Sequence, residues 1–257
     1  MQSAKERRRQ QLFLLEGTHL LESACAVNYP LETVCCTPEW RERHGELWDR
    51  ASQLAVRTET VSVAALEAIA TTVNPDGVVA TAKRKAVDRD GAIAPSGLSL
   101  AVETLQDPGN LGTIIRTAAA AGASGLYLSA DSVDADHPKV LRSSAGQWFR
   151  LPIAVSTDLK AQITRSQQLG VQVIATAADA PVTYWDVDYR RPTLILLGNE
   201  GAGLSAELLA AADRRVSIPL HAGVESLNVA IAAALILYEA RRQNSITDNS
   251  LPDFKPH

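Results

Sequence analysis

The sequence predicts two α/β units, of which the second is built on a mainly parallel sheet. The chain has 257 residues, which exceeds the usual size of one domain. Hydrophobic residues make up 46% and charged residues 21%, so the chain can bury a core along most of its length. After residue 97, near-continuous apolar runs alternate with helical stretches, a pattern typical of parallel strands covered on both faces.

The first unit is predicted to alternate helices and strands. Residues 74–77 (Asn-Pro-Asp-Gly) give a strong turn signal before its last strand. The predicted elements are helices at 18–26, 39–51 and 63–70 and strands at 31–36 and 78–82. We assign residues 1–88 to this unit and residues 89–97 to a linker, because the stretch before residue 98 carries Asp, Gly and Pro with little apolar periodicity.

The second unit is assigned to residues 98–245 and continues the alternation. Its predicted strands lie at 98–105, 125–129, 172–177, 193–197 and 215–219, and its predicted helices at 111–121, 159–169, 206–212 and 227–243. Active sites in such sheets collect at the carboxyl ends of the strands, so the loops that follow strands are where chemistry is expected. Residues 246–257 are polar with two prolines and are predicted to form a mobile tail.

Composition narrows the classes of protein. The net charge of −4 lacks the basic balance that marks many nucleic-acid-binding proteins. The three cysteines have no CxxC spacing, so neither a zinc site nor a disulfide framework is predicted, and we expect no metal. The N-terminus is charged where a secretory signal needs an apolar core, and no apolar run is long enough to span a bilayer. We therefore expect a soluble, cytoplasmic protein.

Positive charge gathers in two short clusters in the first third of the chain. They are Arg7, Arg8 and Arg9 before the first apolar run, and Lys83, Arg84 and Lys85 near the predicted domain edge. Taken alone, such runs are most often solvated surface.

The first loop with candidate chemistry covers residues 106–112 (Gln-Asp-Pro-Gly-Asn-Leu-Gly), between an apolar strand and a helix. Pro-Gly reverses the chain and Asn110 is predicted to cap the helix, so a plain strand-to-helix turn explains the loop by itself. Arg116 lies on a helix otherwise dominated by small or apolar residues. A phosphate or carboxylate would suit its planar guanidinium.

The second loop covers residues 197–205 (Leu-Gly-Asn-Glu-Gly-Ala-Gly-Leu-Ser), again between a strand and a helix. Glycines let a backbone approach a ligand closely and let peptide N–H groups converge on it. The loop lacks the Lys-Ser/Thr ending of a P-loop and the GxGxxG spacing of a dinucleotide fingerprint. A plain turn therefore stays open as an alternative.

The third loop covers residues 218–229 and leads into the most apolar helix of the chain. Ser226 is predicted to be the N-cap of that helix, which explains it without any function. Asn228 then falls in the first turn, where capping does not explain it. An uncompensated buried amide there would cost roughly 1 to 3 kcal/mol, so a ligand is indicated.

Together, in this order and spacing, the three loops resemble the motifs of the SpoU (TrmH-type) RNA 2′-O-ribose methyltransferases of the SPOUT superfamily. The matching segments are Asp-Pro-Gly-Asn-Leu-Gly-Thr-Ile-Ile-Arg at 107–116, Leu-Gly-Asn-Glu-Gly-Ala-Gly-Leu at 197–204, and Ile-Pro-Leu followed by Glu-Ser-Leu-Asn-Val-Ala within 218–230. The likeness covers residues 98–242. Residues 13–17 (Phe-Leu-Leu-Glu-Gly) and 74–80 are similar to the L30e-like substrate-binding module often attached to this family.

The resemblance implies a C-terminal trefoil knot, a homodimer, S-adenosylmethionine as methyl donor and a structured RNA as substrate, with ribosomal RNA favoured over transfer RNA. The implied cofactor-binding residues are Leu197, Gly198, Asn199, Gly203, Ile218, Leu220, Ser226 and Leu227. The implied catalytic residues are Asn110, Arg116, Glu200, Ser226 and Asn228. The two basic clusters become candidates for RNA contact, because an acidic protein needs local positive surface to meet phosphates.

Arg116 matches the arginine proposed in this family as the general base. A guanidinium stays protonated in proteins, so we favour a phosphate clamp that also stabilises the developing alkoxide. A catalytically silent RNA-binding protein with the same fold is the alternative. A nucleotide-dependent oxidoreductase or kinase is disfavoured, because the phosphate-loop patterns of those classes are missing.

Overall fold

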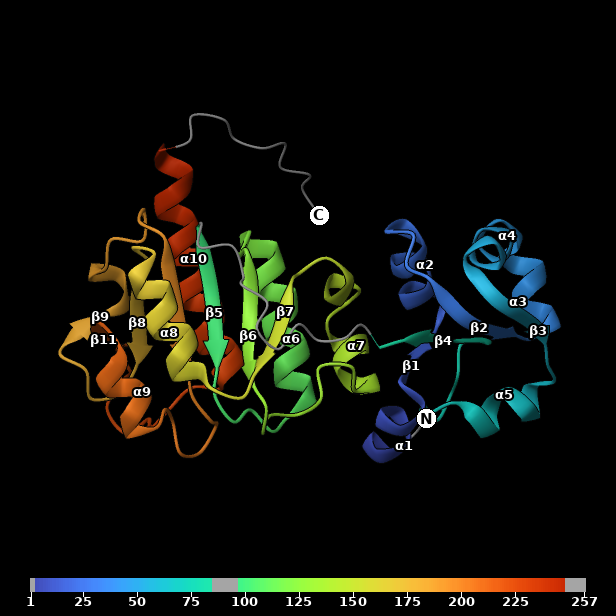
Figure 1. Ribbon diagram of the computed structural model, residues 1–257, viewed down its shortest axis with the longest axis horizontal. Coiled ribbons are helices and arrows are strands. Elements are labelled where there is room, and N and C mark those ends of the chain that lie inside the picture. Colours follow the sequence, from blue (N-terminus) through green and yellow to red (C-terminus); the bar gives the residue numbers. More distant parts are fainter. Residues whose placement is uncertain (1–2, 85–96, 248–257) are drawn as a thin grey trace.

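The computed structural model describes residues 3–84 and 97–247. Lys85, most of the predicted linker and the predicted tail from residue 248 lie outside the described residues. The described part forms two units, each with its own sheet (Figure 1). The searched helices include none that is both long and apolar enough to cross a membrane.

The N-terminal unit, residues 3–84, has a four-stranded sheet in the order β1-β4-β2-β3. The strands are β1 (Leu12–Glu16), β2 (Leu31–Cys36), β3 (Ala55–Thr60) and β4 (Val78–Lys83). β2 and β3 pair in parallel, whereas β4 runs antiparallel to both β1 and β2. The helices are α1 (Ala4–Gln10), α2 (Thr18–Ala26), α3 (Pro38–Arg43), α4 (Gly45–Leu54) and α5 (Val63–Ile69).

One predicted helix of this unit is wrong as a single element. Residues 39–51 form parts of α3 and α4, which are separated at His44, where φ is −125° and ψ is 40°. Gly45 directly follows, and glycine is a poor helix former, so a break at this position is physically reasonable. Strands β1 and β3 were not predicted from periodicity, because β1 is apolar at four consecutive positions and β3 is mostly polar.

The C-terminal unit, residues 97–247, has a seven-stranded parallel sheet in the order β7-β6-β5-β10-β8-β11-β9. The strands are β5 (Leu98–Val102), β6 (Gly125–Ser129), β7 (Ile153–Ser156), β8 (Gln172–Thr176), β9 (Val182–Thr183), β10 (Thr193–Leu197) and β11 (Arg214–Ser217). The predicted parallel α/β sheet is therefore confirmed. Every residue of β5, β6 and β10 is buried, as expected for strands covered on both faces.

The helices of this unit divide between the two faces of the sheet. α6 (Pro108–Ala121) and α10 (Val229–Thr247) share one buried cluster with the sheet, and α8 (Leu159–Gln168) and α9 (Ala206–Ala211) share another. α7 (Pro138–Ser143) and the 3-10 turns η1 (Gln147–Phe149) and η2 (Tyr184–Asp186) complete the unit. α10 extends two residues into the predicted tail.

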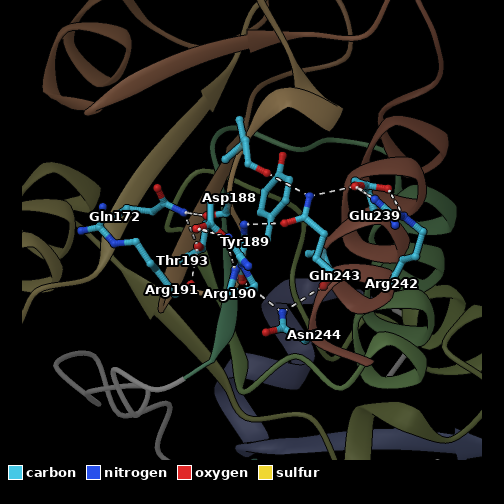
Figure 2. Close-up of polar contacts among 12 residues, drawn as sticks. Gln172, Asp188, Tyr189, Arg190, Arg191, Thr193, Glu239, Arg242, Gln243 and Asn244 are labelled. Atoms are coloured by element: carbon cyan, nitrogen blue, oxygen red, sulfur yellow. Dashed lines mark hydrogen bonds and ion pairs between the residues drawn. The ribbon is translucent and has the colours of Figure 1, made fainter. Parts of the chain in front are cut away.

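The C-terminal end of α10 is tied to the chain just before β10 (Figure 2). The Gln243 amide accepts a hydrogen bond from the Tyr189 N–H and donates one to the Val187 carbonyl, both at 2.9 Å. Asn244 Nδ2 donates to the Tyr189 carbonyl at 3.0 Å. These bonds satisfy backbone groups of the buried residues Val187 and Tyr189 and set the position of α10 against the sheet.

The two units pack against each other around α7, which Figure 1 shows at their boundary. Leu141 of α7 is buried in the core of the N-terminal unit. The rings of Phe13 and Trp148 lie 5.0 Å apart, centroid to centroid. Gly146 has a φ of +77°, and a Cβ there would lie 2.1 Å from Ser23 Oγ of α2. Only glycine allows this close approach of the two units.

A buried charge network crosses the same boundary. Arg7 of α1 keeps 1% of its side chain exposed and pairs with Asp134 at 3.1 Å and with Asp136 at 3.6 Å. Arg84 also pairs with Asp136. Burial raises the pKa of Asp136 even though both arginines act to lower it. The network therefore holds charges that would be costly to leave unpaired.

Candidate active site

The strand order brings two of the predicted loops together. β5 and β10 are neighbours in parallel register, with Val102 opposite Leu197, so the loops that follow them begin side by side. The loop after β10 closes on itself through paired bonds between the backbones of Asn199 and Gly203, each 3.0 Å long. A Cβ on Gly198 would lie 2.1 Å from the Gly203 carbonyl carbon, so this turn requires glycine.

Asn199 ties the second loop to the first. Its Oδ1 accepts from the N–H groups of Gly201 at 2.9 Å and Ala202 at 3.0 Å, and its Nδ2 donates to the Thr104 carbonyl at 2.8 Å and to Glu200 at 3.5 Å. The amide is thus fully engaged within the protein. The Asn199 side chain therefore holds the loops in place, and its assignment to the cofactor site stays a prediction.

A chain of polar side chains joins all three loops. Asn228 Nδ2 donates to Asn110 Oδ1 at 2.9 Å. Asn110 Nδ2 in turn donates to Glu200 Oε1 at 3.2 Å. Three of the predicted catalytic residues, one from each loop, therefore contact one another although up to 118 positions separate them.

Glu200 is the acceptor on which this arrangement converges. Its carboxylate also accepts from the backbone N–H of Asp107 at 3.2 Å and of Gln106 at 3.5 Å. Burial acts to raise the pKa of Glu200. The surrounding donors, its own backbone and the Asn110 amide foremost, outweigh burial and hold the pKa below its ordinary value of 4.5. The donors around Glu200 therefore favour its ionised form, in which it holds the loops together.

The cap of α6 differs from the prediction. Asp107, and not Asn110, precedes the helix and accepts from the Asn110 N–H at 2.8 Å. That bond, the largest influence on this carboxyl, holds the pKa of Asp107 below its ordinary range, and Lys139 acts in the same direction. Pro108 occupies the first helical turn, where its missing N–H costs nothing. Capping by Asp107 leaves the Asn110 side chain free for the contact with the other loops.

The cap of α10 also differs. Asn228, and not Ser226, directly precedes the helix, and its Oδ1 accepts from Ala230 N at 2.9 Å and Ile231 N at 3.4 Å. Asn228 thus caps one helix with its oxygen and holds Asn110 with its nitrogen. Ser226 and Leu227 are exposed and form no hydrogen bond with the described residues.

The backbone around these loops suits a cofactor held by peptide groups. Within the described ranges, the backbone N–H and C=O of Gly198, Ile218 and Leu220 form no hydrogen bond, although Gly198 is buried and the other two are half-buried. Buried peptide groups are normally paired, so these groups are available to a ligand. The Leu197 carbonyl, in contrast, already accepts from Glu103 N at 2.9 Å, and both Gly203 backbone groups close the turn.

Arg116 does not join the loop cluster within one chain. It lies on α6 six residues after Asn110, about 9 Å farther along the helix axis. Its side chain is exposed and forms no hydrogen bond or ion pair with the described part of the protein. The structure thus brings together Asn110, Glu200 and Asn228, and in the described part of the chain neither Arg116 nor Ser226 forms a hydrogen bond with them.

The basic clusters are mostly engaged in ion pairs. Arg7 and Arg84 pair with acids of the C-terminal unit and are largely buried, which leaves them little surface for RNA, and their predicted RNA contact stays a prediction. Arg8 pairs with Asp134, Arg9 with Glu6 and Lys83 with Glu32, yet all three remain exposed. Among the searched residues, no group of three or more His, Cys, Asp or Glu side chains is arranged to hold a metal ion.

The sequence reasoning missed Asp107 and Thr104 as parts of the site. Asp directly before Pro is a helix-start signal that was available in the sequence. Thr104 offered no such signal, because it contributes a carbonyl group and adopts an unusual φ of 53° for a residue other than glycine.

Comparisons with known proteins match both units of the chain. A family model described as the SpoU rRNA Methylase family matches residues 97–238, and a model described as an MRM3-like substrate binding domain matches residues 1–80. An uncharacterized tRNA/rRNA methyltransferase of Synechocystis sp. is 46% identical over 95% of this chain and 88% of its own length. The 23S rRNA (guanosine(2553)-2′-O)-methyltransferase of Bacillus subtilis is 32% identical over 94% of this chain and 93% of its own.

Two solved structures contain the methyl donor AdoMet. The SpoU methyltransferase AviRb from Streptomyces viridochromogenes in complex with AdoMet has a TM-score of 0.83 and 28% identity, covering 95% of this chain and 94% of that one. The AdoMet-bound rRNA methyltransferase from Sinorhizobium meliloti has a TM-score of 0.81 and 32% identity, covering 94% of this chain and 91% of that one.

Proposed function

The chain belongs to the SpoU rRNA methylase family, and from that premise we propose that it methylates a ribose 2′-hydroxyl of a structured ribosomal RNA with S-adenosylmethionine as donor. Membership in a family of methyltransferases favours an enzyme over the catalytically silent alternative. The relatives named as 23S rRNA methyltransferases support ribosomal RNA over transfer RNA.

One observation carries the proposal: three sequence-distant loops meet through the contacts of Asn110 with Glu200 and of Asn228 with Asn110. S-adenosylmethionine supplies a methyl group already activated on a sulfonium, so the protein needs mainly to position the two reactants. We assign the unpaired peptide groups of Gly198, Ile218 and Leu220 to holding the cofactor. We also assign Ser226 and Leu227 to the cofactor site, as the resemblance implies, and the Asn110 and Asn228 amides would orient the ribose.

We propose that Arg116 is a phosphate clamp that also stabilises the developing alkoxide. The exposed guanidinium has no partner among the described residues, so all its N–H groups are available to RNA. Arg116→Lys keeps the charge but loses the planar fork, so turnover should fall on the order of tenfold to hundredfold. Single-turnover methyl transfer measures this, with Arg165→Lys, an exposed residue of α8, as the matched control. A lysine variant with wild-type turnover would refute the clamp.

Methyl transfer to RNA tests the function itself. The purified protein should transfer labelled methyl groups from S-adenosylmethionine to an unmodified 23S ribosomal RNA transcript. Ribose methylation mapped in RNA from cells that lack the protein should show one site lost. Methylation of a transfer RNA pool alone would show that transfer RNA, and not ribosomal RNA, is the substrate class. Absence of methylation of any RNA would refute the proposal.

The apolar face of α10 supports a homodimer as the acting form. Ile231, Leu235 and Tyr238 are exposed, and their spacing places them on one side of the helix. A second copy would cover this face. Light scattering should give twice the chain mass, and Ile231→Glu should give a monomer.

We further propose the trefoil knot and the L30e-like character of residues 1–88. Support for the knot comes from the position of β10 between β5 and β8 and from the return of the chain that places Asn228 beside Asn110. Support for an RNA-binding N-terminal module comes from the substrate-binding-domain match. A crystal structure traced through residues 197–228 checks the knot, and RNA binding by the whole chain compared with residues 97–257 checks the module.

A further inference from the structure

Three basic side chains from both units gather around residues 134–143, at the unit boundary. Arg8 of α1 donates through Nη2 to Asp134 at 2.7 Å. Lys139 and Arg142 are three residues apart on α7, a spacing that makes them neighbours on one helix face. The side chains of Arg8, Lys139 and Arg142 are 63%, 53% and 34% exposed. We call them the boundary cations.

The acids that pair with two boundary cations lie beneath the surface. Asp134 and Glu16 keep only 11% and 3% of their side chains exposed. Burial acts to raise the pKa of Asp134, but Arg8 and its neighbours lower it below the ordinary value, so the carboxylate is charged. Among the described contacts, Arg8 binds Asp134 through Nη2, and Arg142 binds Glu16 and Thr71 through Nη1. Their other guanidinium N–H groups have no partner among the described residues.

Two ion pairs elsewhere on the C-terminal unit have a different geometry, whereas the pair of Arg242 with Glu239, which is 13% exposed, resembles those at the boundary. Lys160 pairs with Glu207, and Arg190 pairs with Asp188, but these acids are 62% and 48% exposed. Both charges of such a pair face the solvent and largely cancel there. For Arg8 and Arg142 the acid faces inward and the cation outward, so positive charge is presented to solvent. Asp107, the partner of Lys139, is 49% exposed, so Lys139 contributes through its own exposure and its position beside the catalytic loops.

The boundary cations adjoin the candidate active site. Lys139 Nζ lies 3.6 Å from Asp107 Oδ2, and Asp107 caps the helix that carries Asn110. A Cβ on Gly109 would lie 3.6 Å from the same Nζ. In the other direction, Arg142 binds Glu16 at the end of β1. A strand of RNA lying on these residues would therefore touch the N-terminal unit and the catalytic loops at once.

We propose that Arg8, Lys139 and Arg142 form a phosphate-binding surface that guides the RNA backbone from the N-terminal unit to the methyl-transfer site. This inference rests on the proposed function for its substrate. Lys139 and Arg142 extend the sequence-based expectation, which included Arg8 but placed the remaining RNA contact at Arg7, Arg9 and residues 83–85. Arg142 also links the two units, because its guanidinium compensates the buried carboxylate of Glu16.

The test uses Arg8→Gln, Lys139→Gln and the double variant, with an unmodified 23S ribosomal RNA transcript as the probe. Arg142 is left intact, because its removal would leave Glu16 buried without a cation. Affinity is measured at several salt concentrations. Loss of one phosphate contact should reduce the slope of log affinity against log salt by about 0.7, equivalent to roughly fivefold weaker binding at 0.1 M salt. The double variant should show about twice the change in slope.

Lys160→Gln is the matched control, because Lys160 is as exposed as Lys139 and also pairs with an exposed acid, but lies on α8, away from the unit boundary (Figure 1). It should keep the wild-type slope and affinity. Thermal unfolding of each variant separates a lost contact from a lost fold. A folded double variant with the wild-type salt slope would overturn the proposal.

Methyl transfer by the wild-type protein is scored separately from binding. RNA binding that depends on the boundary cations, without methyl transfer, would sustain this surface and refute the proposed function. Methyl transfer by the wild-type protein, together with an unchanged salt slope in the double variant, would sustain the proposed function and refute this surface. A wild-type protein that binds none of this RNA, even at low salt, would overturn both.

Discussion

The catalytic loops and the unit boundary both depend on polar contacts between residues far apart in the chain, but they differ in burial. At the loops, the Asn228, Asn110 and Glu200 side chains are exposed or half-buried, and hydrogen bonds alone order them. At the boundary, Arg7 and Asp136 are buried, and the Phe13 and Trp148 rings of the two units pack against each other.

This difference separates the tasks of the two regions. Exposed polar contacts contribute little to stability but keep surfaces available to ligands. A buried ion pair is strongly destabilising to break, because one charge is left without compensation. The boundary is therefore suited to fix the two units relative to each other, and the loops to admit a cofactor and RNA. Four predictions test this division, from the largest expected effect to the smallest.

Arg7→Met should lower the free energy of unfolding by about 3–5 kcal/mol, because Asp134 and Asp136 lose a buried cation. Urea unfolding measures the change. Arg9→Met is the control, since Arg9 is exposed and pairs only locally with Glu6, and it should change stability by less than about 1 kcal/mol. Equal losses of stability in the two variants would show that the buried ion pairs of the boundary stabilise the fold no more than an exposed pair does.

Gly198→Ala should act mainly on the cofactor. The new Cβ would meet the Gly203 backbone, and shifting the turn should cost about 1–3 kcal/mol. S-adenosylmethionine affinity, measured by calorimetry, should fall roughly tenfold or more. Gly201→Ala should bind normally, because its Cβ would make only an ordinary 3.6 Å contact with Asn199. Unchanged affinity in the Gly198 variant would remove this loop from the cofactor site.

A double-mutant cycle on Asn110→Ala and Glu200→Ala should give a coupling energy of about 0.5–1.5 kcal/mol, since the two side chains share a hydrogen bond. Chemical unfolding of the four proteins provides the cycle. Asn110→Ala combined with Glu207→Ala should be additive within about 0.5 kcal/mol, because no bond joins these residues. Additivity in both cycles would show that the loop contact does not hold in solution.

Acid should loosen the loops by a smaller amount. The folded-state pKa of Glu200 is depressed, so its stabilisation is present above the unfolded pKa and is lost as pH falls through the folded value. We expect S-adenosylmethionine affinity to weaken below pH 4.5, the ordinary value for this group. Glu200→Gln should show a smaller acid step, with the remainder coming from Asp107. A step of wild-type size in that variant would assign the acid response to another group.

Much of the fold followed from local patterns. The bounds of α2, β2, β6 and β10 agree with those predicted, because their apolar runs are flanked by clear turn or cap residues. α7 and β7 were missed, because short elements of four to six residues carry too few positions for periodicity to register. The capping predictions at Asn110 and Ser226 were wrong by a few residues, since several polar side chains competed for each helix start.

By itself, the sequence determined the alternation of strands and helices, the three loops and the residue types within them, since all of these depend on near neighbours. Only the tertiary structure decided that Asn110, Glu200 and Asn228 contact one another and that Arg116 lies apart. It likewise decided that Arg7 and Arg84 serve the boundary while Arg8 and Lys139 face solvent. The physical reason is that burial and pairing of a charge depend on partners brought together by sheet order and unit packing, which no short stretch of sequence encodes.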